Sequence, residues 1–151
     1  MNPYLSTFLI AMTPLGELRV SLPVALGVYK MPWQTAFIIS FLGSMIPPIL
    51  ILYLLNPLSD FLMKRSSLAR RFFNWVFSRT RIKSQIIEKY GIIGLAIFVA
   101  IPLPLTGAWT GSIAAVLLGI NLLRAVISIA IGILIAGTIV TLSVLGIVSL
   151  F

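Results

Sequence analysis

The chain contains no cysteine and no histidine, and only 9% of its 151 residues are charged. Without cysteine there are no thiol nucleophiles or disulfides, and without histidine most zinc sites and the common catalytic triads are excluded. The remaining hydroxyls have no recognisable base beside them, so we expect no enzyme activity, no metal and no cofactor. A soluble domain carries about 25% charged residues on its water-facing surface. The shortage of charge therefore predicts that lipid covers much of this protein.

What the chain has in abundance is apolar sequence, with 60% hydrophobic residues and a mean hydropathy of +1.13. Trp33–Leu55 runs for 23 residues without a charge, and Leu122–Phe151 runs for 30 residues with Arg124 near its start. A helix of about 20 residues crosses a hydrocarbon core about 30 Å thick, so both segments are long enough to span. We predict a single all-α membrane domain over residues 1–151.

The positive charge is concentrated in one segment, because eight of the eleven Lys and Arg residues fall between Lys64 and Lys89. Cytoplasmic loops of membrane proteins collect basic residues in this way. Apolar side chains alternate with the bases, which is typical of an amphipathic helix lying on the inner headgroups. We therefore predict that residues 56–90 form a cytoplasmic linker, that membrane lipids are its partner, and that nucleic acid is not.

The other two apolar regions are interrupted in the middle. Met1–Tyr29 breaks at residues 13–16 (TPLG), where Thr13 followed by Pro14 predicts the N-cap and first position of a new helix. Gly91–Gly119 breaks at residues 102–107 (PLPLTG). The arms on either side hold about 12 to 15 residues, too few to cross the core. We expect hairpin breaks at these residues: Pro14, Gly16, Pro23, Pro102 and Pro104.

Two short arms around such a break predict a re-entrant hairpin followed by a full span, once in residues 1–55 and again in residues 91–151. With the basic linker inside, counting crossings makes the two repeats inverted and puts both termini outside. An alternative is that Gly91–Gly119 crosses once despite its prolines, which would put the C-terminus inside.

Glu17 and Arg19 are charges inside the first hairpin, where a buried charge is costly and is usually retained for function. Residues two apart on a helix do not face each other, so the two side chains should meet different partners. Glu17 is a candidate for carrying a coupling proton, and Arg19 for binding an anion. A structural ion pair that locks the hairpin is the alternative.

The second hairpin offers a set of small and hydroxyl residues after its break. A half-helix that begins here directs its free N–H groups inward and suits an anionic headgroup. Glycines in a small-xxx-small packing face and hydroxyls bonded to backbone carbonyls are the competing explanation. The candidate substrate-binding residues, with Arg19, are Thr106, Gly107, Trp109, Thr110 and Ser112.

These two motifs also resemble a known family. Residues 14–23 (PLGELRVSLP) and 102–111 (PLPLTGAWTG) are similar to the signatures of the small multi-drug export protein family, which itself is similar to the DedA superfamily of lipid scramblases and polyprenyl-phosphate flippases. The resemblance covers nearly the whole chain. It implies a multi-pass protein of the prokaryotic inner membrane with two facing hairpins, and it assigns the family's Glu and Arg to Glu17 and Arg19. The DedA proteins carry a further arginine-rich motif in the second hairpin, whereas this chain has no arginine between Lys89 and Arg124.

Three functions remain open at this point. The first is a carrier that moves an amphiphile with an anionic head, such as a polyprenyl phosphate or phospholipid, by alternating access between the hairpins. The second is a proton-coupled exporter of cationic small molecules that uses Glu17. The third is a membrane assembly partner that does not transport. The sequence is compatible with a homo-oligomer and does not identify the substrate.

Overall fold

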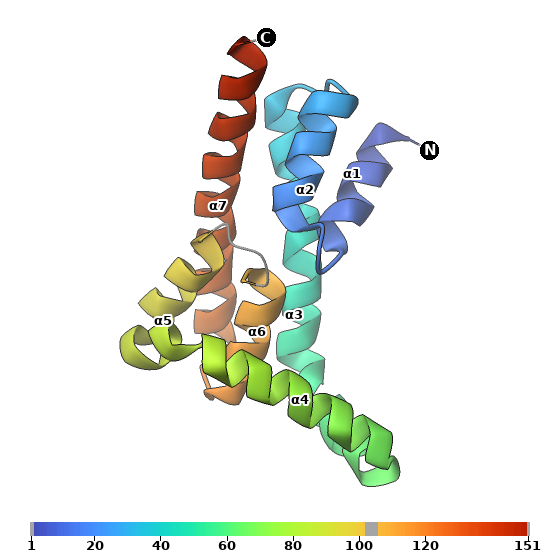
Figure 1. The fold of residues 1–151 in the computed structure, drawn as a ribbon, viewed down its shortest axis with the longest axis vertical. Coiled ribbons are helices and arrows are strands. Elements are labelled where there is room, and N and C mark those ends of the chain that lie inside the picture. Colours follow the sequence, from blue (N-terminus) through green and yellow to red (C-terminus); the bar gives the residue numbers. More distant parts are fainter. Residues whose placement is uncertain (1, 102–105, 151) are drawn as a thin grey trace.

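The computed structural model describes residues 2–101 and 106–150, and these residues are almost entirely helical, without a strand among them. Seven α-helices and one π-helix follow one another along the chain (Figure 1). They are α1 (Pro3–Met12), α2 (Glu17–Pro23), the π-helix η1 (Val24–Val28), α3 (Trp33–Arg65), α4 (Ser67–Lys83), α5 (Gln85–Ala100), α6 (Ala108–Leu117) and α7 (Leu122–Leu150).

The two long helices have the length and composition of membrane spans. α3 holds 33 residues and α7 holds 29, so at 1.5 Å per residue they measure about 50 Å and 44 Å. Only 28% and 44% of their most apolar windows are buried inside the protein. The core helix of a soluble protein would be mostly buried, so these apolar surfaces face outward, toward lipid.

α3 is longer than the predicted span, because it continues through Leu55 and Pro57 to Arg65. Lys64 and Arg65 lie in its last turn, where positive side chains interact favourably with the negative end of the helix dipole. α3 therefore extends ten residues past Leu55, and the basic segment continues as α4 and the start of α5.

α4 is the amphipathic helix that the sequence predicts in this region. Phe73, Val76 and Phe77 are partly buried against the bundle. Leu68 and Trp75 are exposed on a different face, and Arg79 lies 5.3 Å from the centre of the Trp75 ring. Exposed apolar and basic side chains on one helix are typical of a helix that lies at a membrane surface.

The first hairpin consists of α1, a tight turn, and α2 continued by η1. The predicted N-cap at Thr13 is wrong by three residues, because the N-cap of α2 is Gly16. The Thr13 hydroxyl does cap a turn by accepting from the Gly16 N–H at 2.9 Å. Glu17, however, has a left-handed φ of 35°, which separates that turn from α2.

Pro23 is not a break, contrary to the prediction. It is the last residue of α2, and the chain stays helical as η1. Proline has no N–H, so one α-helical hydrogen bond is missing here, and the following turn relaxes to the wider π pattern, in which the Tyr29 N–H donates to the Val24 carbonyl at 3.1 Å.

The second half begins at Gly91, whose φ of 58° and ψ of −130° interrupt α5. This position matches the predicted start of the second apolar region. The remainder of α5 and the ten-residue α6 are each too short to cross a bilayer. Pro102 and Pro104 lie outside the described residues.

The packing of the helices is similar but not identical in residues 1–65 and 91–150. α1 packs against α3, and α5 packs against α7. α2 packs about equally against α3 and α7, whereas α6 packs mainly against α3. Figure 1 shows both termini at one end of the bundle and α4 across the other end.

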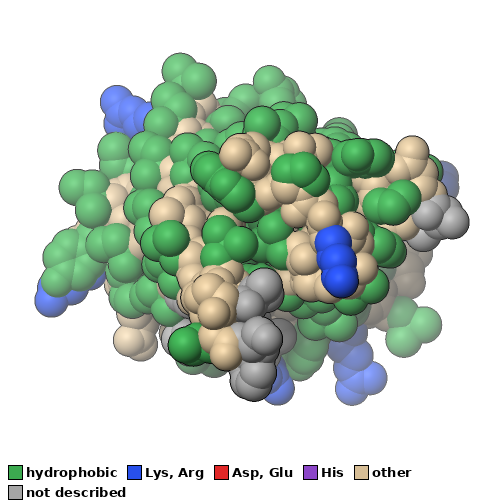
Figure 2. Space-filling model, turned by 90° about the horizontal axis from the view of Figure 1, so that it is seen from above, with side chains coloured by type: hydrophobic (Ala, Val, Ile, Leu, Met, Phe, Trp, Pro, Cys, Tyr) green, Lys and Arg blue, Asp and Glu red, His purple; other side chains and the backbone are tan. Residues whose placement is uncertain are grey.

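Close helix contacts in this bundle depend on glycine. A Cβ on Gly43 would lie 2.8 Å from the Ala11 Cβ, where α1 crosses α3. A Cβ on Gly132 would lie 2.6 Å from the Val99 Cβ, where α5 crosses α7. Small residues allow this approach, which stabilises helix pairs in lipid through van der Waals contact. Apolar side chains cover most of the face at the terminal end, with isolated Lys and Arg side chains among them (Figure 2).

Candidate functional site: the junction of the two hairpins

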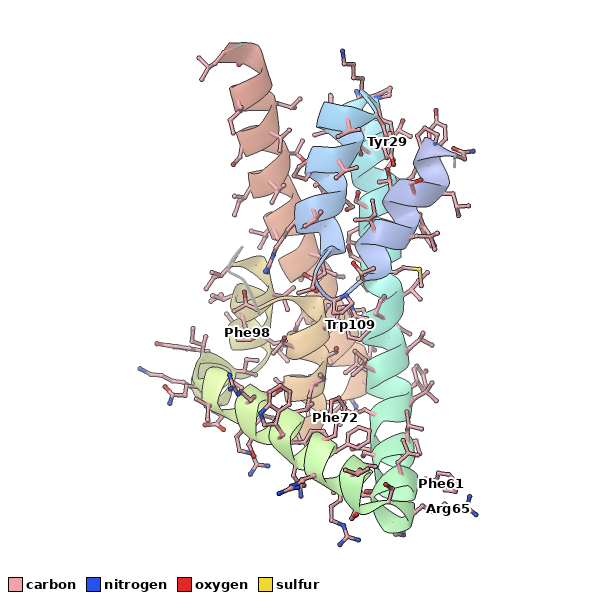
Figure 3. The ribbon with its side chains drawn as sticks, turned by 45° about the vertical axis from the view of Figure 1, so that its right-hand side comes forward. Tyr29, Phe61, Arg65, Phe72, Phe98 and Trp109 are labelled. Atoms are coloured by element: carbon pink, nitrogen blue, oxygen red, sulfur yellow. The ribbon has the colours of Figure 1, made fainter. Side chains whose placement is uncertain are left out.

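The charged motif of the first hairpin lies against the interrupted helices of the second. Figure 3 shows Trp109, in the first turn of α6, about midway along the molecule, between Tyr29 at one end and Arg65 at the other. Glu17 and Arg19 reach this level from the start of α2. The junction therefore combines residues that lie about 90 positions apart in the sequence, as the separations of 87 and 92 in two of its hydrogen bonds show.

Glu17 caps the N-terminus of α6. Its Oε1 accepts a hydrogen bond from the Trp109 backbone N–H at 3.2 Å, and the side chain is only 8% exposed. The N-cap residue of α6 is Gly107, which has no side chain of its own to bond the free N–H groups. Glu17 supplies the missing acceptor from another segment, and its negative charge is favourable at the positive end of the helix dipole.

Gly107 permits this contact by its lack of a side chain. A Cβ at this position would lie 2.8 Å from Oε1 and 3.0 Å from the carboxyl carbon of Glu17. Its φ of 138° is also in the region that favours glycine. A glycine at this position thus allows the close approach of the carboxylate from the first hairpin.

Arg19 binds the other interrupted end. Its Nη1 donates to the Thr106 carbonyl at 2.8 Å, and its Nη2 donates to the Ile101 carbonyl at 2.9 Å. Ile101 is the C-cap of α5, so this guanidinium satisfies carbonyls that the end of a helix leaves without an internal partner. Its positive charge is favourable at this negative end of the helix dipole.

Glu17 and Arg19 therefore form what we call the hairpin clamp: each side chain binds the end of a broken helix whose dipole has the opposite sign. The prediction that they meet different partners agrees with these contacts. The opposite charges of Glu17 and Arg19, both on α2, thus bind the start of α6 and the end of α5. Each contact is charge-assisted, which makes it roughly twice as strong as a neutral hydrogen bond.

The other predicted site residues lie around the clamp in different ways. The Thr106 hydroxyl donates to the Ile101 carbonyl at 3.0 Å and so supports the segment that Arg19 binds. Ser112 is fully buried and donates to the Trp109 carbonyl at 2.7 Å. Thr110 is partly exposed. The Trp109 indole N–H is buried and has no hydrogen-bond acceptor within the described residues.

Gly16 and Pro14 occupy the turn that delivers Glu17. A Cβ on Gly16 would lie 3.1 Å from the Ile10 carbonyl carbon and would also meet the Thr13 hydroxyl. Gly111 has a packing function, because a Cβ there would lie 2.7 Å from the Val99 Cγ2 on α5. The proposed small-residue packing of the second motif thus describes Gly111, whereas Gly107 adjoins the Glu17 carboxylate.

The Ile101 carbonyl is a member of the site that sequence reasoning missed. A signal for it exists, because a helix that ends inside a membrane before prolines leaves carbonyls without partners, and lipid cannot satisfy them. An arginine elsewhere in the bundle is the natural donor for such carbonyls.

Gly107→Ala should separate the hairpins, whereas Gly119→Ala should not. Both glycines have positive φ values, 138° and 68°, but a Cβ on Gly119 has nothing within 4 Å. Both variants therefore bear backbone strain of about 1–3 kcal/mol, with the larger share at Gly107, whose φ of 138° and ψ of −168° are essentially restricted to glycine. Only Gly107→Ala also pushes against the Glu17 carboxylate. Thermal unfolding in detergent measures the difference. Equal loss of stability in the two variants would show that the carboxylate contact contributes nothing.

The sequence matches the model of one protein family. The model of the family described as "Putative small multi-drug export protein" matches residues 17–139, a range that starts at Glu17 and includes Arg19, the described part of the second motif and most of both long helices. The chain belongs to the small multi-drug export protein family. A family of export proteins agrees with the two apolar helices that are long enough to cross a membrane. No curated protein and no solved structure matches the chain.

Proposed function

We propose that this member of the small multi-drug export family carries an amphiphile with an anionic head across the inner membrane, by alternating access between two facing re-entrant hairpins. The observation that carries the proposal is the hairpin clamp. The N-terminus of α6 holds a carboxylate, so the junction is a place where an anionic group is stabilised. A substrate phosphate would need the same backbone donors and the same neighbouring arginine.

The packing of α1 on α3 and of α5 on α7 supports an inverted repeat. In such transporters, substrate sites lie near the bilayer midplane where broken helices of the two repeats meet. α2 packs on α7 and α6 on α3, so the second arm of each hairpin belongs to the interface between halves. Movement of one hairpin relative to the other long helix would open the junction toward one side of the membrane at a time.

Glu17 connects the two hairpins and is the natural gate. As a carboxylate it accepts from the Trp109 N–H and holds α6 against α2. Protonation converts the carboxylate into a weaker acceptor, which loosens the clamp and frees the start of α6 for a substrate anion. A proton and an anionic substrate would then bind together, and the resting clamp would re-form when both leave.

A proton-coupled exporter of cationic compounds is the second candidate, favoured by the description of the family and by the acidic side chain at the junction. Arg19 counts against it, because its guanidinium lies in the same junction and repels a cation in a site of low dielectric constant. The two candidates differ in the sign of the charge that the junction accepts.

Reconstitution into liposomes tests the function. We expect the wild-type protein to move a fluorescent anionic phospholipid between leaflets faster than protein-free liposomes do, and a headgroup-accessible quencher measures this movement. It should not move a cationic dye. Dye export driven by a proton gradient, without lipid movement, would favour the second candidate. Movement of neither compound would favour an assembly partner without transport.

The orientation is also a proposal. α4 lies at one end of the bundle. We propose that this end is cytoplasmic, because cytoplasmic segments are rich in Lys and Arg, as α4 is. Both termini lie at the opposite end. Single cysteines at Asn2 and Lys30 should therefore react with an impermeant thiol reagent applied to whole cells, and a cysteine at Ser67 should react only after the cells are permeabilised. The reverse pattern would invert the topology.

A further inference from the structure

We propose that a groove at the terminal end of the bundle binds an anionic lipid, with its headgroup at Lys30 and one acyl chain along α3 and α7. We call it the Lys30 groove, and its wall residues used below are Lys30, Trp33, Phe37, Thr138, Leu142 and Leu145. The proposal concerns binding only, and it stands whether or not the protein transports. It adds a second lipid site, separate from the hairpin junction.

The groove consists of two adjoining hollows. One has a volume of about 410 Å³ and includes Lys30. The other has a volume of about 310 Å³ and lies between α3 and α7. Trp33 and Leu145 line both hollows, so the two lie side by side. Pockets that bind small ligands have volumes in this range.

The wall of the second hollow is suited to an acyl chain. Aromatic rings of Trp33 and Phe37 line it from α3, and leucines line it from α7. Leu142 is 67% exposed and Leu145 is 37% exposed, so the hollow opens toward the lipid phase. From Leu145 to Thr138 the α7 side of the groove covers about 10 Å of helix rise, the length of several methylene groups.

Lys30 decides the class of headgroup. It follows η1 and lies three residues before Trp33, the first residue of α3. Tryptophan at the start of a span is typical of the membrane–water interface, so Lys30 lies at the level of the lipid phosphates. A lysine there attracts an anionic lipid and repels a cationic amphiphile. A lipid with an anionic headgroup and an acyl chain matches both the charge of Lys30 and the apolar wall of the second hollow.

Fluorescence quenching tests the proposal directly. A Trp75→Phe, Trp109→Phe variant keeps Trp33 as its only tryptophan. In detergent micelles, we expect phosphatidylglycerol with brominated chains to quench Trp33 at about fivefold lower mole fraction than brominated phosphatidylcholine, the preference that one lysine near the surface supplies. Lys30→Gln should bring the two lipids to the same half-point, and Lys30→Arg should restore the preference.

Two further variants separate the groove from general lipid contact. Thr138 is exposed and its hydroxyl bonds only within α7, to the Leu134 carbonyl at 2.8 Å, so Thr138→Phe should fill the groove and weaken quenching by both lipids without unfolding the protein. Arg124→Gln removes an exposed charge at the start of α7, outside the groove, and should leave the preference unchanged.

Equal quenching by the two lipids, or a preference that survives Lys30→Gln, would overturn the proposal. If replacing Trp109 destabilises the hairpin junction, native mass spectrometry of the otherwise unmodified protein serves instead. Wild-type protein should then retain more phosphatidylglycerol than the Lys30→Gln variant does, and equal retention would also overturn the proposal. Both measurements detect binding in micelles, so a failure of the transport function leaves their outcome unaffected.

Discussion

Arg19→Gln is expected to lower the free energy of unfolding by about 3–5 kcal/mol and to reduce lipid transport nearly to the rate of protein-free liposomes, because it removes one member of a buried charge-assisted cluster. Arg19 donates to the carbonyls of Thr106 and Ile101 at 2.8 and 2.9 Å. Glutamine is shorter and neutral, so it cannot reach both carbonyls, which lipid cannot satisfy either. The Thr106 hydroxyl still donates to the Ile101 carbonyl at 3.0 Å, but the two bonds from the guanidinium are lost.

Arg19→Lys separates charge from geometry. Lysine keeps the positive charge but presents it at one point, whereas the guanidinium bonds two carbonyls from two nitrogens. We expect a loss of stability about half as large and partial transport. Arg124→Gln is the matched control, since Arg124 is exposed at the start of α7. Thermal unfolding in nanodiscs and the liposome assay measure both effects. Wild-type stability of Arg19→Gln would show that the clamp does not hold the hairpins.

The positions of the long helices could be predicted from the sequence, because a span in lipid needs about 20 apolar residues and this requirement is local. The end of α3 could not. Asn56 and Pro57 are typical of a helix end, yet α3 continues to Arg65, where α4 packs against it. Packing from a distant segment outweighs local propensity here, even though a proline inside a helix costs about 3 kcal/mol.

The hairpin junction was predictable in its members but not in its pairings. Charges and prolines inside apolar segments are energetically costly, so Glu17 and Arg19 can be recognised as candidate site residues from the sequence alone. Their partners are backbone groups, Trp109 N–H and the carbonyls of Ile101 and Thr106. Every residue has such groups, so residue identity carries no signal for them. Only the packing of α2 against the second half selects which backbone groups the two charges meet.

Glu17 also has a left-handed backbone conformation that the sequence does not predict. A φ of 35° is uncommon for glutamate, and strained backbone of this kind persists where surrounding contacts over-determine it. Here the turn before it is fixed by the Thr13 cap and by the tight packing of Gly16. The strain therefore serves to direct the start of α2 toward α6, which is a property of the folded pair of hairpins.

Glu17→Gln separates the two transport functions, and its expected effects have opposite signs. For a carrier of anionic amphiphiles, the carboxylate competes with the substrate for the Trp109 N–H and the start of α6. A neutral amide competes less, so the apparent affinity for the anionic lipid should rise severalfold, and transport should no longer respond to a proton gradient. For an exporter of cations, Glu17 must exchange a proton for the substrate, so the same variant should be inactive.

The amide of Glu17→Gln also caps α6 more weakly, by about 1–2 kcal/mol, which unfolding in nanodiscs will show. Glu88→Gln, at an exposed position of α5, is the matched control and should change neither quantity. Because the N–H groups at the start of α6 and the guanidinium of Arg19 favour an anion at this junction, we expect the gain in lipid affinity. A folded Glu17→Gln protein that binds anionic lipid less tightly than the wild type would contradict the carrier of anions and leave the cation exporter.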